Sequence, residues 1–172
     1  MDKTALNLDK AIVLNMLKNI EIERKFLVKG DFLPFSSKKE RIIQAYLSVD
    51  PERAVRIRVK GENAFITIKG LTNANGFSCL EFEYPIPVAD AEKMLELAAS
   101  EIIDKERHYI PFNNHIFEVD VFHGNHEGLI VAELELMSEN EPFDKPDWLG
   151  EEVTGDERYY NVYLATHPFN NI

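Results

Sequence analysis

The sequence predicts an α+β protein in which a β-sheet closes into a barrel with a charged interior. Seven of the predicted strands carry charged side chains at alternate positions, with apolar residues on the opposite face. Acidic and basic residues are sorted by strand, whereas a solvated face would normally mix them with Thr, Ser and Gln. A sheet that closes can turn its charged faces inward and leave its apolar faces to be covered by helices.

The composition is typical of a single folded domain, with 172 residues and a hydrophobic fraction of 45%. A net charge of −11 argues against broad contact with nucleic acid or an anionic membrane, although a local basic cluster can still bind phosphate. We find no apolar run long enough to span a membrane and no signal-peptide pattern. Cys79 is the single cysteine, so no internal disulfide forms. We therefore expect a soluble, cytoplasmic protein.

The first 19 residues differ from the rest and are interpreted as an N-terminal extension to one domain at residues 20–172. Leu8, Ile12 and Met16 recur at helical spacing, which favours a short amphipathic helix. Met16 is an alternative start of the biological chain. In that case the residues before it would carry no function.

The first predicted strand, residues 20–28, places two carboxylates and an ammonium on one face. Side chains alternate along a strand, so Glu21, Glu23 and Lys25 share a row opposite apolar residues, which Arg24 interrupts. Taken alone, this strand would be interpreted as a surface strand with its charges in water. The other strands decide between the two interpretations.

The remaining elements are predicted from the same alternation and from the turn residues between strands. Residues 30–39 are interpreted as a connection with one helical turn. Further strands are predicted at residues 41–49, 54–60, 64–69, 77–86, 102–111, 116–122 and 129–137. Helical spacing predicts an amphipathic helix at 88–100 and a short Tyr-rich helix at 157–166, with Asp156 as the N-cap of the latter.

The sorted charges define a predicted lumen with seven cations and eight carboxylates. The cations are Lys25, Arg56, Arg58, Lys60, Lys69, Lys105 and Arg107. The carboxylates are Glu21, Glu23, Glu81, Glu83, Glu118, Asp120, Glu133 and Glu135. Unpaired charges are too costly in a dry interior, so this lumen must hold water and ions. Its cations suit a polyanion and its carboxylates suit Mg²⁺ or Mn²⁺, which together predict a metal–triphosphate site.

The motif Glu-x-Glu-x-Lys at residues 21–25 resembles the signature of the CYTH superfamily, also called triphosphate tunnel metalloenzymes. The resemblance covers about residues 19–168 and includes residues 55–60, 67–70, 81–83, 105–107, 117–122, 132–136 and 148–159. It implies an eight-stranded antiparallel tunnel, with a C-terminal helix that plugs one end. It also implies hydrolysis or cyclisation of triphosphate compounds with a divalent metal.

The resemblance also implies roles for individual residues by their positions in the motif. It assigns catalysis to Lys25, Glu21 and Glu23, and triphosphate binding to Lys25, Arg56, Arg58, Lys69, Lys105 and Arg107. It assigns the metal to Glu21, Glu23, Glu81, Glu83, Glu133 and Glu135, and our predicted metal set adds Asp120. Glu106 stands where the family pattern has Thr, and Phe117 where it has Trp. Neither departure removes a charged lumen residue.

The predicted function is metal-dependent hydrolysis of triphosphate compounds, above all inorganic tripolyphosphate, with nucleoside triphosphates as weaker substrates. Two alternatives stay open, namely an adenylate cyclase of the same fold and a module that binds polyphosphate or nucleotides without turnover. The expected partner is a small-molecule triphosphate, and the oligomeric state is open, with a homodimer as one option. Cys79 has the parity of a lumen residue but is interpreted as a buried, inert thiol.

Overall fold

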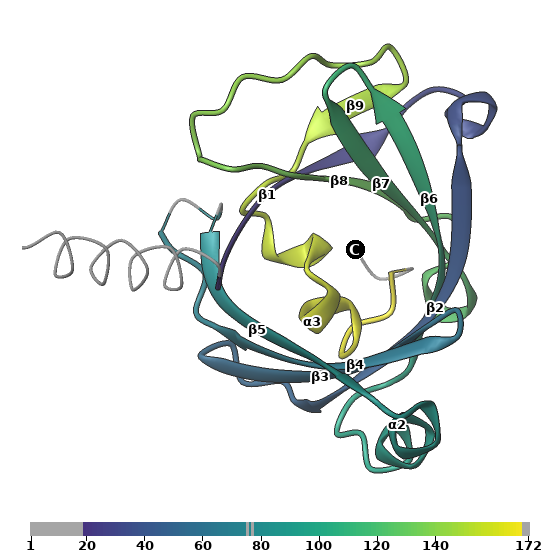
Figure 1. Ribbon diagram of the computed structural model, residues 1–172, viewed down its shortest axis with the longest axis vertical. Helices are drawn as coiled ribbons and strands as arrows, with labels where there is room; N and C mark the ends of the chain where they lie inside the picture. Colours follow the sequence, from purple (N-terminus) through teal and green to yellow (C-terminus); the bar gives the residue numbers. More distant parts are fainter. Residues whose placement is uncertain (1–18, 75, 77, 170–172) are drawn as a thin grey trace, which may run out of the picture.

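The computed structural model describes residues 19–74, 76 and 78–169, which form an antiparallel β-barrel (Figure 1). The barrel strands are β1 (Ile20–Val28), β2 (Lys38–Ser48), β3 (Arg53–Lys60), β4 (Asn63–Gly70), β5 (Ser78–Ile86), β6 (Ile103–Phe112), β7 (His115–Phe122) and β8 (Ile130–Glu135). Their order is β5-β4-β3-β2-β6-β7-β8-β1, and antiparallel pairing of β1 with β5 closes the ring. The predicted eight-stranded antiparallel barrel is confirmed.

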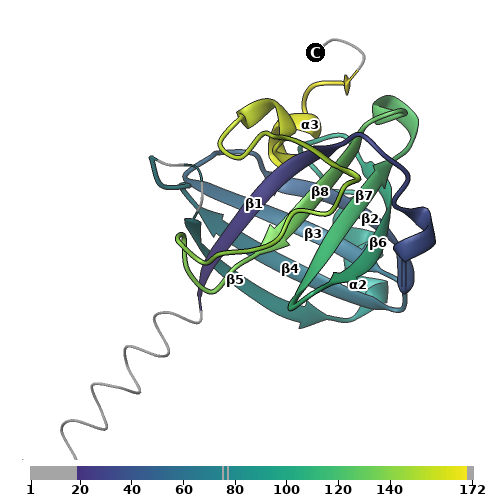
Figure 2. The same ribbon diagram turned by 90° about the horizontal axis from the view of Figure 1, so that it is seen from above.

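Two helices take different places relative to the barrel. Helix α2 (Val88–Leu95) lies outside it beside β3 and β4, where Ala91 packs against Ile57 and Ala64 (Figure 1). Helix α3 (Asn161–Leu164) lies at one end of the barrel, as Figure 2 shows from the side. Short 3-10 turns span Leu33–Phe35, Gly124–His126 and Glu157–Tyr159.

Both helical predictions were too long. Helix α2 ends at Leu95 and not at residue 100, because the following residues bond to β2. The amide of Ala99 donates to the carbonyl of Tyr46, and the amide of Tyr46 donates to Ser100 Oγ. The segment 157–166 is divided into a 3-10 turn and α3, while Asp156 caps the turn as predicted by accepting from the amide of Arg158.

A ninth strand, β9 (Leu149–Glu152), was missed by the sequence analysis. It pairs with the end of β1, where Phe26 faces Glu152 and Val28 faces Leu149. The strand passes so close to β1 that a Cβ built at Gly150 would lie 2.8 Å from the carbonyl oxygen of Leu27. Glycine is therefore required at this position.

The largest apolar core lies outside the barrel, between its wall and the connection from β8 to β9. Phe26, Phe117 and Leu134 point outward from β1, β7 and β8, and they are fully buried beside Trp148 of that connection. The Trp148 ring meets the Phe117 ring edge-on, with 5.5 Å between centroids. This burial leaves the inward faces of the strands free to carry charge.

The predicted N-terminal helix lies outside the described residues, so that helix and the domain boundary at residue 20 stay predictions. Within the described part of the chain, no helix has the length and apolar character needed to cross a membrane.

Candidate active site

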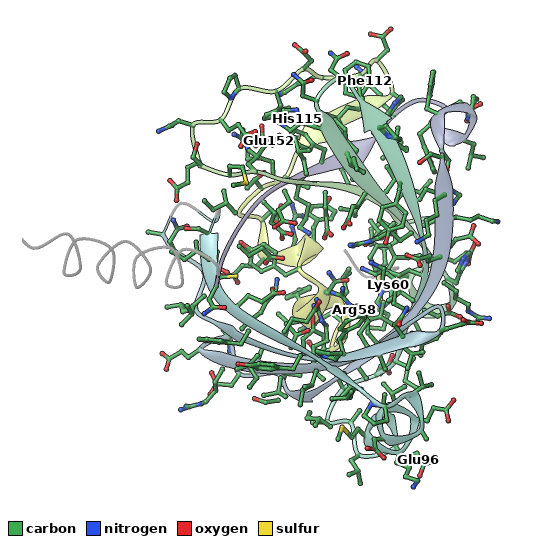
Figure 3. The ribbon with its side chains drawn as sticks, viewed as in Figure 1. Arg58, Lys60, Glu96, Phe112, His115 and Glu152 are labelled. Carbon is green, nitrogen blue, oxygen red and sulfur yellow. The ribbon has the colours of Figure 1, made fainter. Side chains whose placement is uncertain are left out.

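Two cavities lie inside the barrel and at one of its ends. The first, which we call the lumen, has a volume of about 200 Å³ and is lined by Glu21, Glu23, Arg56, Arg58, Lys60, Lys69, Glu81, Glu83, Arg107, Glu118, Glu133, Glu135 and Asn161. The second, which we call the vestibule, has a volume of about 800 Å³ and adjoins α3 and residues 70–74, 76, 78 and 79. Most of the site residues predicted from the sequence therefore line one cavity, and Figure 3 shows two of the lumen cations, Arg58 and Lys60.

The register of the strands explains this convergence. Lys25 of β1 lies opposite Glu133 of β8, and Arg107 of β6 lies opposite Asp120 of β7. Directly paired residues point to the same face of a sheet, so each pair brings opposite charges together in the interior.

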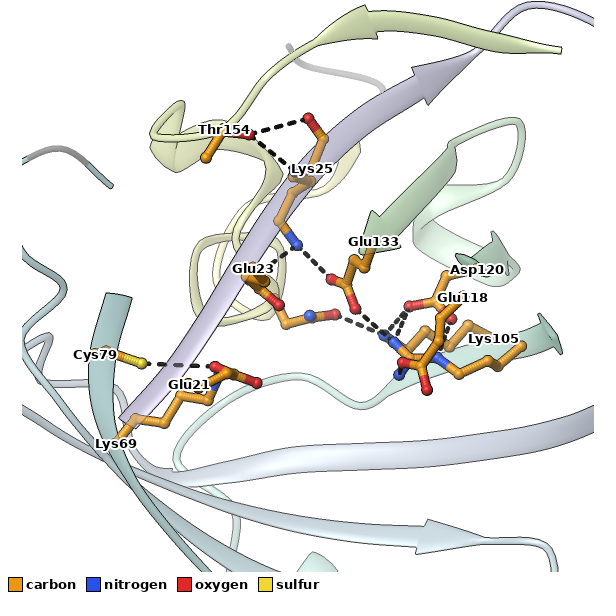
Figure 4. Close-up of polar contacts among 12 residues, drawn as sticks. Glu21, Glu23, Lys25, Lys69, Cys79, Lys105, Glu118, Asp120, Glu133 and Thr154 are labelled. Carbon is orange, nitrogen blue, oxygen red and sulfur yellow. Dashed lines mark hydrogen bonds and ion pairs between the residues drawn. The ribbon is translucent and has the colours of Figure 1, made fainter. Parts of the chain in front are cut away.

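Lys25 is the most tightly held of the predicted catalytic residues. It is 3% exposed, and its Nζ pairs with Glu133 and lies 3.5 Å from a carboxylate oxygen of Glu23 (Figure 4). Burial lowers the pKa of Lys25, but the carboxylates of Glu133 and Glu23 outweigh it and raise that pKa overall. The backbone is fixed as well, because the amide of Lys25 donates to Thr154 Oγ1 at 2.9 Å. Lys25 is thus a permanent cation in a fixed position.

Asp120 lies beneath two predicted substrate-binding cations. Its Oδ1 accepts from Arg107 Nε at 2.6 Å, and its Oδ2 accepts from Arg107 Nη2 at 2.7 Å and from Lys105 Nζ at 2.5 Å. Burial raises the pKa of Asp120, but Arg107 and Lys105 lower it by more. The pKa is therefore below its ordinary value, and the carboxylate stays charged. Lys105 and Asp120 are each 1% exposed, and neither is among the described residues that line the two cavities. This arrangement favours Asp120 as a support for Arg107, while its role as a metal ligand stays a prediction.

A third group joins β1, β4 and β5 at the other side of the lumen. Lys69 Nζ pairs with Glu21 and lies 2.8 Å from a carboxylate oxygen of Glu81. Cys79 Sγ lies 3.6 Å from Glu21 Oε2, so the thiol faces the interior and lines the vestibule. Burial and the nearby Glu21 and Glu81 raise the pKa of Cys79 to about 12, even though Lys69 opposes them. The thiol therefore stays protonated, as expected of an inert group.

Two neighbouring guanidinium groups on β3 differ sharply in their partners. Arg56 donates to Thr67 Oγ1 at 3.1 Å and lies 3.4 Å from a carboxylate oxygen of Glu83. Within the described chain, Arg58 has no carboxylate at ion-pair distance, and its buried Nε has no hydrogen-bond acceptor. Burial lowers the pKa of Arg58 to about 10, and the positive charges of Arg56 and Arg107 add to the effect. Arg58 is therefore a cation poised for an anion that enters the lumen.

Three lumen carboxylates have raised pKa values. Burial raises the pKa of Glu23, Glu118 and Glu135, and neighbouring carboxylates add to the rise, although Lys25 opposes it at Glu23 and the paired Arg107 opposes it at Glu118. In Glu135 the nearby negative charge comes mainly from Glu21. Carboxylates under such repulsion are stabilised by a cation.

The residues present fit a hard divalent cation. Glu81 Oε2 is buried with Lys69 Nζ as its charged neighbour at 2.8 Å, and ligand atoms of Glu21, Cys79 and Glu81 lie within 4.8 Å of one another. Glu23 and Glu135 face each other across β1 and β8 on the same face. Carboxylate oxygens in this arrangement are the ligands that Mg²⁺ and Mn²⁺ prefer.

Several residues of the site were not assigned a role from the sequence. Lys60 and Glu118 line the lumen, and their alternation with apolar neighbours already placed them on the charged face. Asn161 also lines the lumen, and Thr154 holds the backbone of Lys25. No periodicity indicates these last two residues, because they lie on a short helix and a loop.

Comparisons with known proteins agree with this geometry. A family model described as the CYTH domain matches residues 19–166. A protein of Acetivibrio thermocellus named inorganic triphosphatase is 44% identical over 152 residues, which cover 88% of this chain and 96% of that protein. A protein of the same name from Nitrosomonas europaea is 35% identical over 150 residues, covering 84% of this chain and 96% of its own.

Among solved structures, a crystal structure described as the inorganic triphosphatase NE1496 superposes with a TM-score of 0.62 at 33% identity. The match covers 86% of this chain and 95% of that one. The family model spans almost the whole described chain, and the relatives match along nearly their full length. This chain therefore belongs to the CYTH domain family.

Proposed function

We propose that this protein is a metal-dependent triphosphatase whose preferred substrate is inorganic tripolyphosphate, with nucleoside triphosphates as weaker substrates. The observation that carries the proposal is the division of the lumen: among the described residues Arg58 forms no ion pair and its buried Nε has no acceptor, while burial and nearby carboxylates raise the pKa of Glu23, Glu118 and Glu135. A polyanion and a divalent cation bound together would compensate both. The two relatives named inorganic triphosphatase support the same substrate.

The phosphate chain is held by the basic side of the lumen. Arg58 and Arg107 present guanidinium groups, which bind phosphate oxygens through paired hydrogen bonds, and Lys25, which lines the adjoining vestibule, supplies a fixed point charge. Lys60, half-shielded from solvent, adds a further cation at the same wall. These groups offset the negative charge that develops on the leaving phosphate.

The acidic side supports the metal and the attacking water. Glu21, Glu23, Glu81 and Glu135 would hold Mg²⁺ or Mn²⁺, which when bound polarises the phosphoryl group and lowers the pKa of a water. Glu23 lies beside Lys25, and burial raises its pKa, so its carboxylate is suited to accept a proton from that water. Two of the predicted metal ligands are paired with cations: Glu83 with Arg56, and Glu133 with Lys25.

The same proposal covers the setting of the enzyme. Its partner is a small-molecule triphosphate, and the net charge of −11 opposes nucleic acid and anionic membranes as partners. We place it in the cytoplasm, where the thiol of Cys79 stays reduced beside the site.

The test is phosphate release from tripolyphosphate, ATP, thiamine triphosphate and pyrophosphate, each with Mg²⁺, Mn²⁺ or a chelator, with nucleotide products identified. Release that requires metal and is fastest from tripolyphosphate is the expected result. Cyclic AMP from ATP without phosphate release would instead establish the cyclase. Tight metal-dependent binding without any product would establish a binding module.

A further inference from the structure

The lumen and the vestibule meet at a junction that α3 helps to form. Five of the described residues line both cavities, and four of them, Glu21, Glu23, Arg56 and Lys69, belong to barrel strands. The fifth is Asn161, the first residue of α3. Its side chain is thus the part of the C-terminal segment that reaches the charged lumen.

The vestibule exists because the seam between β1 and β5 is short. These strands pair through Ile20–Ile22, after which the same edge of β1 turns to β9 at Phe26. The opening is lined by residues 70–74, 76, 78 and 79 and by the segment around α3. Its lining includes Tyr46, Val49, Leu71, Val162 and Tyr163, whereas every residue lining the lumen except Asn161 is charged. The two cavities therefore differ in both size and chemistry.

Asn161 is held in place through both its side chain and its backbone. Its Oδ1 accepts a hydrogen bond from Lys105 Nζ at 3.0 Å, and that ammonium is in turn anchored on Asp120 (Figure 4). Its backbone carbonyl accepts from the amide of Ala165 at 2.9 Å within α3. Because Lys105 is 1% exposed, this anchor is rigid. The Nδ2 of Asn161 is left as a hydrogen-bond donor at the junction.

The volumes of the cavities determine what this position controls. The lumen has about a quarter of the volume of the vestibule, about 200 Å³ against about 800 Å³, and its lining is charged. Its size and charge suit a phosphate chain, and the larger vestibule suits an attached organic group. A group attached beyond the third phosphate that leaves the lumen on the side of α3 passes the junction into the vestibule of about 800 Å³.

We propose that Asn161 is a specificity-determining residue: it partitions the lumen from the vestibule and thereby favours inorganic tripolyphosphate over triphosphates that carry an organic group. The inference rests on the proposed function of the lumen. The side chain of Asn161 narrows the passage by its bulk. Its hydrogen bond to Lys105 keeps the side-chain amide in this orientation. Removal of the side chain opens the passage without removing any charge.

The experiment compares kcat/KM for tripolyphosphate and for ATP in four proteins: the wild type, Asn161→Ala, Asn161→Leu and Thr166→Val. Leu has the branched shape of Asn and is somewhat larger, but it accepts no hydrogen bond, whereas Ala loses both the bulk and the bond. Thr166 is the matched control, because it lies on the same segment and lines the vestibule but not the lumen. Melting temperatures show whether each variant is folded, and Asn161→Ser replaces Asn161→Ala if the latter does not fold.

The expected result for Asn161→Ala is a rise of about tenfold in the ratio of kcat/KM for ATP to that for tripolyphosphate, mainly through KM for ATP, since single steric contacts in a site give discrimination of this order. Asn161→Leu should keep the ratio within about twofold while lowering both rates, and Thr166→Val should match the wild type. A ratio in Asn161→Ala equal to that of the wild type would overturn the inference, even if both rates fell.

Dissociation constants for tripolyphosphate and ATP, measured by calorimetry, separate this inference from the proposed function. If the wild type binds both compounds but releases no phosphate, the triphosphatase is refuted while the ratio of dissociation constants still decides the role of Asn161. A ratio of dissociation constants that moves toward ATP in Asn161→Ala supports the partition. An unchanged ratio overturns it.

Discussion

Replacing Arg58 by Met should make the protein more stable and weaken its response to triphosphate. The pKa of Arg58 falls from its ordinary value to about 10, because burial and the positive charges of Arg56 and Arg107 disfavour the guanidinium ion. One pKa unit corresponds to about 1.4 kcal/mol, so the charged form costs the fold about 3 kcal/mol at most. Met keeps the apolar stem without the charge. We expect the free energy of unfolding to rise by about 1–3 kcal/mol.

The sign of this effect follows from the direction of the shift. A group whose folded pKa is lowered by burial of its cation destabilises the fold at every pH below that pKa. The penalty therefore applies in full at pH 7 and disappears as the pH rises from about 10 toward the ordinary value for Arg. Bound tripolyphosphate should remove the same penalty, since it supplies the missing anion.

The assay is urea unfolding at pH 7, with and without tripolyphosphate. Arg58→Met should be more stable than the wild type without ligand and should gain less on adding it. Arg56→Met is the matched control, because Arg56 has Glu83 and Thr67 as partners. Its pKa is raised, because neighbouring acidic groups outweigh the effect of burial. That variant should lose about 1 kcal/mol or more. Loss of stability in Arg58→Met, or an undiminished response to tripolyphosphate, would refute the reasoning.

Three further predictions concern the buried charges. Lys25→Arg should lower kcat roughly tenfold or more with little change in melting temperature, since the guanidinium keeps the charge but not the shape of the ammonium; steady-state rates at wild-type level would contradict it. Asp120→Asn should cost about 3–5 kcal/mol in urea unfolding, because Arg107 and Lys105 lose their buried carboxylate, whereas Glu118→Gln serves as the milder control. Burial lowers the pKa of Lys105 to about 8. Between pH 8 and 10.5, the free energy of unfolding of the wild type should therefore rise relative to that of Lys105→Met. Parallel pH profiles of the two proteins would exclude this titration.

The strands were predictable because their alternation is a local signal that the barrel reinforces. Residues 54–60 were predicted as a strand, and β3 spans Arg53–Lys60. The signal is weaker where the first residues of a strand are polar on both faces. For this reason the prediction missed the start of β2, which begins at Lys38, three residues before the predicted start. β9 carried no detectable period in four residues. It forms because the end of β1 offers an unpaired edge and Gly150 permits close approach.

The inward side of each strand was predictable, but the pairing of charges within the lumen was not. Parity alone placed Arg56 and Arg58 on one face, and it treats them as equivalent. The closed barrel makes them different, because β4 and β5 bring Thr67 and Glu83 within bonding distance of Arg56, whereas no described carboxylate lies at ion-pair distance from Arg58. Parity likewise grouped Asp120 with the metal ligands, whereas its register opposite Arg107 engages both of its oxygens.

The contribution of the C-terminal segment depends on contacts that no local pattern encodes. Thr154 reaches the backbone of Lys25 from 129 residues away in the chain, and Asn161 reaches Lys105 from 56 residues away. Both contacts fill gaps left by the sheet: Thr154 at the β1 edge between β5 and β9, and Asn161 beside a buried ammonium that Asp120 alone would not satisfy. An ammonium has three donors, so a neutral acceptor from α3 adds a second hydrogen bond without adding charge. Hydrogen bonds therefore join the C-terminal segment to the charged lumen. A substitution in one should alter the structure of the other.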